Sequence, residues 1–228
     1  MTDLAAGLPQ PRYRLVIFDW DGPLMDSEAR IVDCLQAASL ATGMGELPAH
    51  AARDIIGLGL PEAMERLFPG ATAEQCEALV AAYKAHFVAV DTTPLDFFPG
   101  VEAGIQRLRR HPEQLLAVAT GKSRRGLDRM FTAHDCGDWF HASRTADLTL
   151  SKPHPRMLEE LLAELNVEAH EALMVGDTEY DLEMARALGM HSVGVDYGVH
   201  SVPRLEACAP QRIVSHFDEL MDWLYVAR

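Results

Sequence analysis

The sequence predicts an α/β protein in which helices cover a parallel β-sheet and a helical module is inserted after the first strand. Two features predict this fold. Short apolar runs alternate with amphipathic helical patterns over most of the 228 residues, and such alternation is typical of a parallel sheet with helices on both faces. The stretch from about Leu24 to Leu95 breaks the alternation, because it carries helical patterns and no strand pattern.

The first strand is expected over Arg14–Phe18, where an apolar run ends at Asp19. Runs without polar alternation indicate strands that are buried on both faces. Four later runs have the same character: Leu115–Ala119, Leu173–Val175, Ser192–Val195 and Ile213–Val214. Helices are expected between most of them, since Pro155 suits the first turn of one helix and Gly189 suits the end of another.

The spacing of apolar residues predicts helices in the inserted segment, residues 24–95. Thr72 and Gln75 form a capping box that is followed by an apolar stripe, and an earlier helix face is equally apolar. These positions are Cys76, Leu79, Tyr83, Phe87 and Val90 in the stripe, and Ile31, Leu35 and Ala38 in the earlier helix. The segments 91–94 and 98–100 read as the return linker. We therefore expect a core of residues 1–23 and 96–228 and a helical domain of residues 24–95.

Composition limits the classes of function. The formal net charge of -14 argues against nucleic-acid binding, which needs a basic face. No apolar run is long enough to cross a bilayer, and residues 1–10 lack the pattern of a signal peptide, so a short frayed leader is expected there. The four cysteines form no CxxC pair, which predicts reduced thiols in a cytoplasmic protein and no zinc site.

The most informative segment begins where the first strand ends, with Asp19–Trp20–Asp21–Gly22. Ligands bind at the carboxyl ends of strands in open α/β sheets, so the position suits a site. One carboxylate of such a pair can attack phosphorus while the other exchanges a proton with the attacking or leaving oxygen. The alternative is an acidic turn in which an aspartate caps a helix.

A second acidic pair, Asp177 and Asp181, follows the run Leu173–Val175. Carboxylates here reach the same edge of the sheet, and oxygen ligands are those that magnesium prefers. Helix capping by Asp177 or Thr178 is the structural alternative, but it accounts for only one of these acidic residues.

Two further segments complete the set. Thr120, Gly121 and Lys122 follow the run Leu115–Ala119, and a hydroxyl with the free amides of a turn makes a small anion cradle. Lys152 precedes a helix, where a single lysine is usually solvated. Several carboxylates that converge on a dianionic substrate need cations to offset repulsion, and a metal with one lysine is the minimal supply.

Along the chain the four segments come in the order Asp19, Thr120, Lys152 and Asp177 with Asp181. In this order they resemble the motifs of the haloacid dehalogenase superfamily, in its phosphoglycolate-phosphatase-like branch, over about residues 14–224. The resemblance implies a Rossmann-like core with an inserted helical cap domain. It also implies a phosphoric monoester hydrolase in which Asp19 is the nucleophile and Asp21 the general acid and base. Thr120 and Lys152 then hold the phosphoryl group. Mg²⁺ is held by Asp19, the Asp21 backbone carbonyl and Asp177, with Asp181 supporting the metal or its waters.

One residue departs from the family pattern. Pro23 stands where the family usually has Thr or Val, and proline removes a backbone N–H and fixes φ. The residues expected to bind the metal and the phosphoryl group remain, so we expect catalytic activity to survive. How far proline at this position changes the catalytic efficiency stays open.

Substrate choice is expected to lie in the inserted helices and after Thr120. The segment 55–60 is a candidate cap loop, with Arg53 as its nearest cation, although a plain helix–helix turn fits as well. Gly121 and the basic residues Lys122, Arg124 and Arg125 are candidates for gripping a carboxylate or second phosphate, or for a solvated helix start. His200 is expected to be structural.

The leading hypothesis is a Mg²⁺-dependent phosphatase of a small phosphorylated metabolite, such as phosphoglycolate or a sugar phosphate, acting through an aspartyl-phosphate. An inorganic pyrophosphatase, a phosphomutase and a non-catalytic binder of phosphorylated ligands stay open as alternatives. The expected partners are small molecules, without nucleic acid or membrane, for a cytoplasmic monomer or small homo-oligomer.

Overall fold

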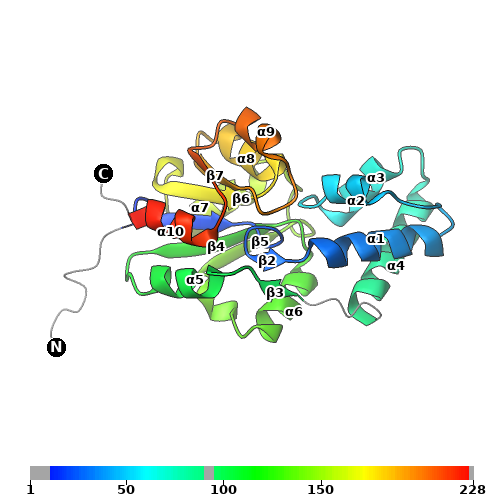
Figure 1. Cartoon of the computed structure of the whole chain (residues 1–228), viewed down its shortest axis with the longest axis horizontal. Coiled ribbons are helices and arrows are strands. Elements are labelled where there is room, and N and C mark those ends of the chain that lie inside the picture. Colours follow the sequence, from blue (N-terminus) through cyan, green and yellow to red (C-terminus); the bar gives the residue numbers. More distant parts are fainter. Residues whose placement is uncertain (1–10, 90–94, 226–228) are drawn as a thin grey trace.

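The computed structural model describes residues 11–89 and 95–225, so the expectations for residues 1–10, Val90 and the linker 91–94 lie outside the described residues. The fold is an α/β sandwich with a group of helices beside it (Figure 1). Six strands form the main sheet: β1 Leu15–Phe18, β4 Leu115–Thr120, β5 Ala142–Thr145, β6 Ala172–Gly176, β7 His191–Val195 and β8 Arg212–Val214. Their order is β5-β4-β1-β6-β7-β8 and every pairing is parallel. The predicted fold class is confirmed.

Strand β1 lies in the interior of the sheet because its four residues are apolar and fully buried. It pairs with β4 on one side and β6 on the other, so that Phe18 lies level with Val118 and Val175. Residues 19, 120 and 177 therefore lie together at the edge of the sheet formed by the carboxyl ends of these strands. At β1 the strand order runs outward on both sides, to β4 and β5 on one side and to β6, β7 and β8 on the other. This is the position at which open α/β sheets bind ligands.

The two faces of the sheet bury alternate residues of β1. Val16 and Phe18 pack on one face and Leu15 and Ile17 on the other, as the two-residue period of a strand requires. One face is covered by α5 Val101–Arg109, α6 Arg124–Ala133 and α10 Phe217–Tyr225, and the other by α7 Arg156–Leu165 and α8 Glu179–Ala187 (Figure 1). The remaining core elements are α9 Val202–Ala207 and the 3-10 turns Gly137–Trp139 and Ala169–Glu171.

The described part of the inserted segment forms four helices, which lie to one side of the sheet (Figure 1). They are α1 Glu28–Ala41, α2 Ala49–Asp54, α3 Leu60–Leu67 and α4 Ala73–Ala89, and they are called the inserted helices below. They share a hydrophobic cluster of their own, which contains the predicted positions Ile31 and Leu35 of α1 and Cys76, Leu79, Tyr83 and Phe87 of α4. Ala38 is buried as well but is not part of this cluster. The capping box also forms, since the amide of Gln75 donates to Thr72 and that of Thr72 to Gln75.

The expectation of no strand between Leu24 and Leu95 is wrong in one detail. The two residues of β2, Met25–Asp26, pair antiparallel with β3, Asp96–Phe97. This short ribbon ties the departing and the returning chain together, and the amide of Phe98 adds a hydrogen bond to the carbonyl of Leu24 (2.9 Å). A two-residue strand is too short to give a periodic sequence pattern. Strand β5 was also absent from the predicted strands, because its sequence Ala-Ser-Arg-Thr is mostly polar.

Leu79 tests whether the cluster of the inserted helices contributes to global stability. Its side chain is fully buried in α4, so Leu79→Ala should lower the free energy of unfolding by about 2–5 kcal/mol. Leu40→Ala is the matched control, because Leu40 is 59% exposed on α1 and should change that value by less than about 0.5 kcal/mol. Urea denaturation followed by circular dichroism measures both, and equal midpoints for the two variants would contradict the assignment.

Candidate active site

Asp19 and Asp21 follow the end of β1. Trp20, the residue between them, packs into the hydrophobic core on the side of the chain opposite the two carboxylates. Trp20 is fully buried and makes edge contacts with the rings of Phe97 and Phe131, with centroids 5.8 and 5.3 Å apart. Because successive side chains of extended backbone alternate in direction, burying Trp20 turns the two carboxylates toward the other side. The Asp-Trp-Asp spacing thus positions both acids through the apolar residue between them.

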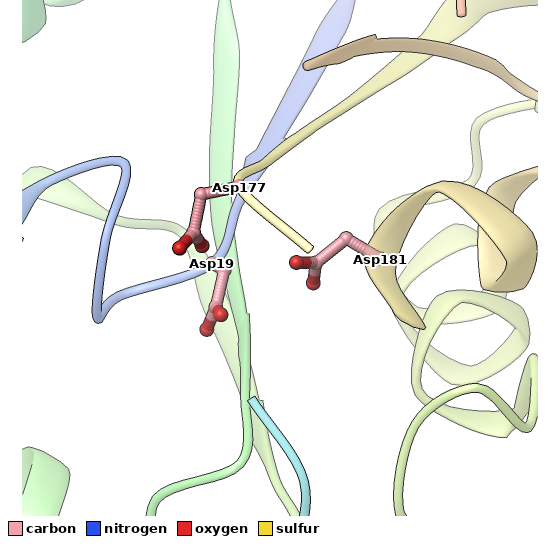
Figure 2. A group of neighbouring side chains, drawn as sticks. All are labelled: Asp19, Asp177 and Asp181. Carbon is pink, nitrogen blue, oxygen red and sulfur yellow. The ribbon is translucent and has the colours of Figure 1, made fainter. Parts of the chain in front are cut away.

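Asp177 follows β6, and Asp181 lies in the first turn of α8. Figure 2 shows the carboxylates of Asp19, Asp177 and Asp181 directed toward a common space. One oxygen from each of the three lies within 4.8 Å of the others, and all three residues are buried. The structure therefore brings together the three carboxylates that the family resemblance implied around a metal.

Asp181 uses its two oxygens differently. Its Oδ2 accepts from the hydroxyl of Thr178 (2.7 Å) and from the Thr178 amide (3.3 Å), which forms a capping box at the start of α8. Its Oδ1 lies 2.7 Å from Nζ of Lys152. The capping alternative is confirmed for Thr178, which is the N-cap of α8 and accepts from the amide of Asp181. The cap also fixes the Asp181 carboxylate that contacts Lys152.

Lys152 is the buried cation of the cluster. Its Nζ lies 2.9 Å from Oδ1 of Asp19 as well as 2.7 Å from Asp181, and its side chain is fully buried. Burial alone would lower the pKa of the Lys152 ammonium, but the adjacent Asp181 and Asp19 carboxylates raise it above its ordinary value. Lys152 is therefore held in its charged form between two carboxylates.

The carboxylates themselves are crowded. Burial raises the pKa of Asp19 to about 7; Lys152 opposes the rise, and the Asp181 and Asp21 charges add to it. Burial, with the charges of Asp181 and Asp19, raises the pKa of Asp177 well above its ordinary range. One lysine does not balance three carboxylates, so the cluster favours a further cation.

The donor set fits a hard divalent cation. Asp19 Oδ2 and Asp177 Oδ1 are buried and accept no hydrogen bond from the described residues, which leaves oxygen lone pairs that a cation can use. All three candidates are carboxylate oxygens, the ligands typical of Mg²⁺. Gly22 and Gly198 make room beside them, since a Cβ at either position would fall 2.2 Å from Asp177 side-chain atoms.

Asp21 lies apart from this cluster and has its own partners. Its Oδ1 accepts from the Ser27 hydroxyl at 2.5 Å, and its Oδ2 lies 2.8 Å from Nζ of Lys122. Sequence reasoning did not assign Ser27 a role, and it placed Lys122 in the substrate site and not beside the acid. Two fixed contacts hold the Asp21 carboxylate in one orientation, as a group that exchanges protons requires.

Thr120 and Gly121 lie where β4 ends. The Thr120 hydroxyl accepts from the amide of Lys122 (3.2 Å) and is fully buried. A Cβ on Gly121 would lie 2.5 Å from the carbonyl oxygens of both Gly57 and Leu58. The candidate cap loop 55–60 is therefore a helix–helix turn, between α2 and α3, that also packs directly against the predicted anion cradle.

Two predicted substrate residues point elsewhere. The Arg124 guanidinium is bound by Ser143 (2.6 Å) and Asp128 (2.5 Å), and Arg124 does not line the cavity at the site. Arg53 is exposed, pairs with Glu28 and does not line that cavity either. Arg125 and Arg129 of α6 line it instead; they lie four residues apart and so share a helix face, from which Arg124 is rotated away.

The inserted helices are held to the core beside the site. The Tyr180 hydroxyl donates to the carbonyl of Asp54 (2.6 Å), and Arg204 of α9 pairs with the Asp54 carboxylate. The amide of Gly59 donates to the Ser151 hydroxyl (2.7 Å). These contacts attach the chain around the turn 55–60 to Tyr180 and Ser151, which are the sequence neighbours of Asp181 and Lys152 in the carboxylate cluster.

Three predictions outside the cluster concern structure. His200 is buried, accepts from the amide of Glu179 (3.0 Å) and donates through its own amide to the carbonyl of Asp177 (3.3 Å), which is a structural role. The four cysteines are free thiols, as expected. Within the described residues, every helix is too short or too polar to cross a membrane.

A family model described as haloacid dehalogenase-like hydrolase matches residues 16–195, which is most of the chain. The chain belongs to this family. The family resemblance predicted from the four motifs is confirmed. The match begins inside β1 and ends with β7, so it spans every residue of the cluster.

Relatives of this hydrolase carry phosphatase names. The chain is 35% identical over 211 residues to a protein named "Probable phosphatase IndB" from Dickeya dadantii, with 91% of each chain covered. It is 28% identical to a phosphoglycolate phosphatase from Mesorhizobium japonicum, with 90% of this chain and 92% of the relative covered. The predicted enzyme class, a phosphoric monoester hydrolase, agrees with the family and with these relatives.

Solved structures share the fold. A crystal structure of a predicted phosphatase from Clostridium acetobutylicum superposes with a TM-score of 0.82 at 25% identity, covering 92% of this chain and 97% of that one. A hydrolase from Pseudomonas syringae gives a TM-score of 0.84 at 22% identity, with 93% and 99% covered. These likenesses confirm the Rossmann-like core of this family member.

Thermal unfolding tests the cation site independently of activity. Saturating Mg²⁺ should raise the Tm of the wild-type protein by about 5 °C or more over the value in chelator, because a ligand that binds only the folded state stabilises it. Asp177→Asn should lose that response and keep the metal-free Tm or raise it, since one of three repelling charges is gone. Asp222→Asn, at an exposed position of α10, is the control and should respond like the wild type. A full Mg²⁺ response in Asp177→Asn would remove Asp177 from the ligand set.

Proposed function

We propose that this family member is a Mg²⁺-dependent phosphatase that hydrolyses a small phosphorylated metabolite through a covalent aspartyl-phosphate. One observation carries the proposal: the buried Asp19 carboxylate shares its space with Asp177 and Asp181, contacts Lys152 and keeps one oxygen without a hydrogen bond from the described residues. A nucleophile needs a lone pair that no protein donor occupies.

In the first half-reaction, an oxygen of Asp19 attacks phosphorus and the bond from phosphorus to the leaving oxygen breaks. Asp21 gives its proton to that oxygen, so an alcohol departs. The contacts of Asp21 with Ser27 and Lys122 support this role, because they fix the acid next to the nucleophile in sequence and in space.

In the second half-reaction, Asp21 accepts a proton from water, and the hydroxide oxygen attacks the phosphorus of the aspartyl-phosphate. The bond between phosphorus and the Asp19 oxygen breaks, which releases phosphate and restores the carboxylate. Asp21 is available for both transfers because it is not one of the three clustered carboxylates and has partners of its own, Ser27 and Lys122.

Lys152, Thr120 and the amide of Gly121 are the proposed holders of the transferring phosphoryl group. Lys152 is already charged and fixed by Asp19 and Asp181, so it needs no reorganisation when the substrate arrives. Asp19, Asp177 and the Asp21 backbone carbonyl would hold Mg²⁺, with Asp181 in support. When bound, Mg²⁺ neutralises charge on the phosphoryl oxygens and on the carboxylates.

We propose that residues 24–95 act as a cap domain on a core of residues 1–23 and 96–228. The separate hydrophobic cluster of the inserted helices and the packing of Gly57 and Leu58 on Gly121 support this division. A cap that excludes bulk water protects the aspartyl-phosphate and strengthens electrostatic contacts inside the site. We further propose a cytoplasmic enzyme, a monomer or small homo-oligomer, without nucleic-acid or membrane partners.

Asp19→Asn tests the nucleophile. With p-nitrophenyl phosphate and Mg²⁺, the wild type should turn over and chelator should stop it, while Asp19→Asn should lower kcat by about a thousandfold or more because an amide oxygen is a poor nucleophile. Asp33→Asn, an exposed residue of α1, is the matched control and should keep wild-type kcat. Full activity of Asp19→Asn would refute the covalent route, and equal wild-type rates with and without chelator would refute the metal requirement.

Pro23 tests whether this chain is a weakened family member. The turn is closed by the amides of Gly22 and Met25, which donate to the carbonyls of Met25 and Trp20 at 3.0 and 2.9 Å, and the Tyr197 hydroxyl donates to the carbonyl of Pro23. None of these bonds uses an N–H at position 23. Pro23→Thr should therefore leave kcat within about threefold of the wild type. A tenfold rise would mean that proline impairs the loop.

A further inference from the structure

A cavity of about 540 Å³ opens between the inserted helices and the core. Asp19 and Asp21 belong to its walls, so it is continuous with the proposed reaction centre. Any group that leaves from a phosphoryl group held by Asp19 must therefore be accommodated in this space. The cavity falls within the roughly 300–1,000 Å³ that enclose drug-sized ligands.

The inserted helices give the cavity apolar walls. Most of the residues that they contribute are apolar, and they include Ile31 and Leu35 of α1, Ile56 and Leu58 of the turn before α3, and Tyr83 and Phe87 of α4. Two are aromatic rings on neighbouring turns of α4, with centroids 5.7 Å apart. Apolar and aromatic walls favour a ligand that brings apolar surface of its own.

The cations in the cavity do not form a buried grip for a short acid. Lys122 is paired with Asp21, and its Nζ also lies 5.3 Å from the centre of the Phe87 ring. Lys84 and Arg125 are exposed, and Arg129 is half-buried. A two-carbon carboxylate next to the phosphoryl group would leave most of the apolar wall uncovered.

We propose that this cavity binds the leaving group of the substrate, and that the substrates are phosphate monoesters of a bulky alcohol with an apolar, ring-bearing body. The inference rests on the proposed phosphatase function and narrows it away from phosphoglycolate. The phosphoryl group lies at Asp19, the ester oxygen faces Asp21, and the ring packs against Tyr83 and Phe87. The exposed charged residues remain available to polar substituents that project beyond the ring.

Three primary alkyl esters with similar leaving oxygens test this assignment: ethyl phosphate, phosphoglycolate and 2-phenylethyl phosphate. Because the three esters have the same kind of reacting centre, differences between their kcat/KM values measure how well the cavity binds each leaving group. The wild type with Mg²⁺ should show a kcat/KM for 2-phenylethyl phosphate that is about tenfold or more above both others, as expected for burying one ring.

Phe87→Ala and Leu79→Ala form the matched pair. Both residues are buried on α4 in the same cluster, but only Phe87 lines the cavity. The preference for 2-phenylethyl over ethyl phosphate should fall by about tenfold in Phe87→Ala, mainly through KM, and stay within about twofold of the wild-type ratio in Leu79→Ala. Equal loss in both variants would attribute the preference to cap stability and overturn the ring contact.

The two proposals fail in different ways. Equal kcat/KM for the three esters, a preference for phosphoglycolate, or hydrolysis of p-nitrophenyl phosphate with none of the three, would overturn the substrate class and leave a phosphatase. Hydrolysis of neither p-nitrophenyl phosphate nor the three esters would overturn the phosphatase function itself.

Discussion

Three buried carboxylates share one corner of the sheet, and their mutual repulsion is the constraint to which the surrounding structure responds. A carboxylate without water is costly unless a cation or hydrogen-bond donors compensate it. Lys152 neutralises part of the charge of Asp19 and Asp181, and the amide of Val199 donates to Asp177 at 2.9 Å. The remaining excess of negative charge favours the binding of a cation in this corner.

The fold can maintain this arrangement because each acid is fixed by something other than the acids themselves. Asp19 is set by the central strand and by the burial of Trp20 among aromatic rings, and Asp181 by a helix cap. Asp177 is enclosed by backbone at Gly22 and Gly198. The cost of bringing like charges together is thus offset by local packing and capping, which persist when the cation is absent. A site built this way is preorganised.

The sequence predicted the part of the site that depends on strand ends. Apolar runs locate β1, β4 and β6, and residues 19, 120 and 177 follow from parallel pairing. What the sequence left open depends on side-chain direction. Arg124 and Arg125 are adjacent, yet helix geometry turns only Arg125 toward the cavity. Lys122 contacts Asp21 through a loop whose path no periodicity reports, and the complete burial of Lys152 depends on contacts between distant segments.

The residues proposed for the reaction and those proposed for substrate choice are held by different parts of the fold. The proposed reacting groups extend from the sheet, where backbone hydrogen bonds in register fix their positions. Most of the apolar wall of the cavity comes from the inserted helices, whose contacts with the core include Tyr180 with Asp54 and Gly59 with Ser151. Apolar packing tolerates exchange of side chains of similar volume, whereas the buried charges do not. If the proposed roles hold, substitutions in the inserted helices can change the leaving group while Asp19, Asp21 and Lys152 stay the same. For that reason the cavity walls, and not the buried charges, support the proposed substrate class.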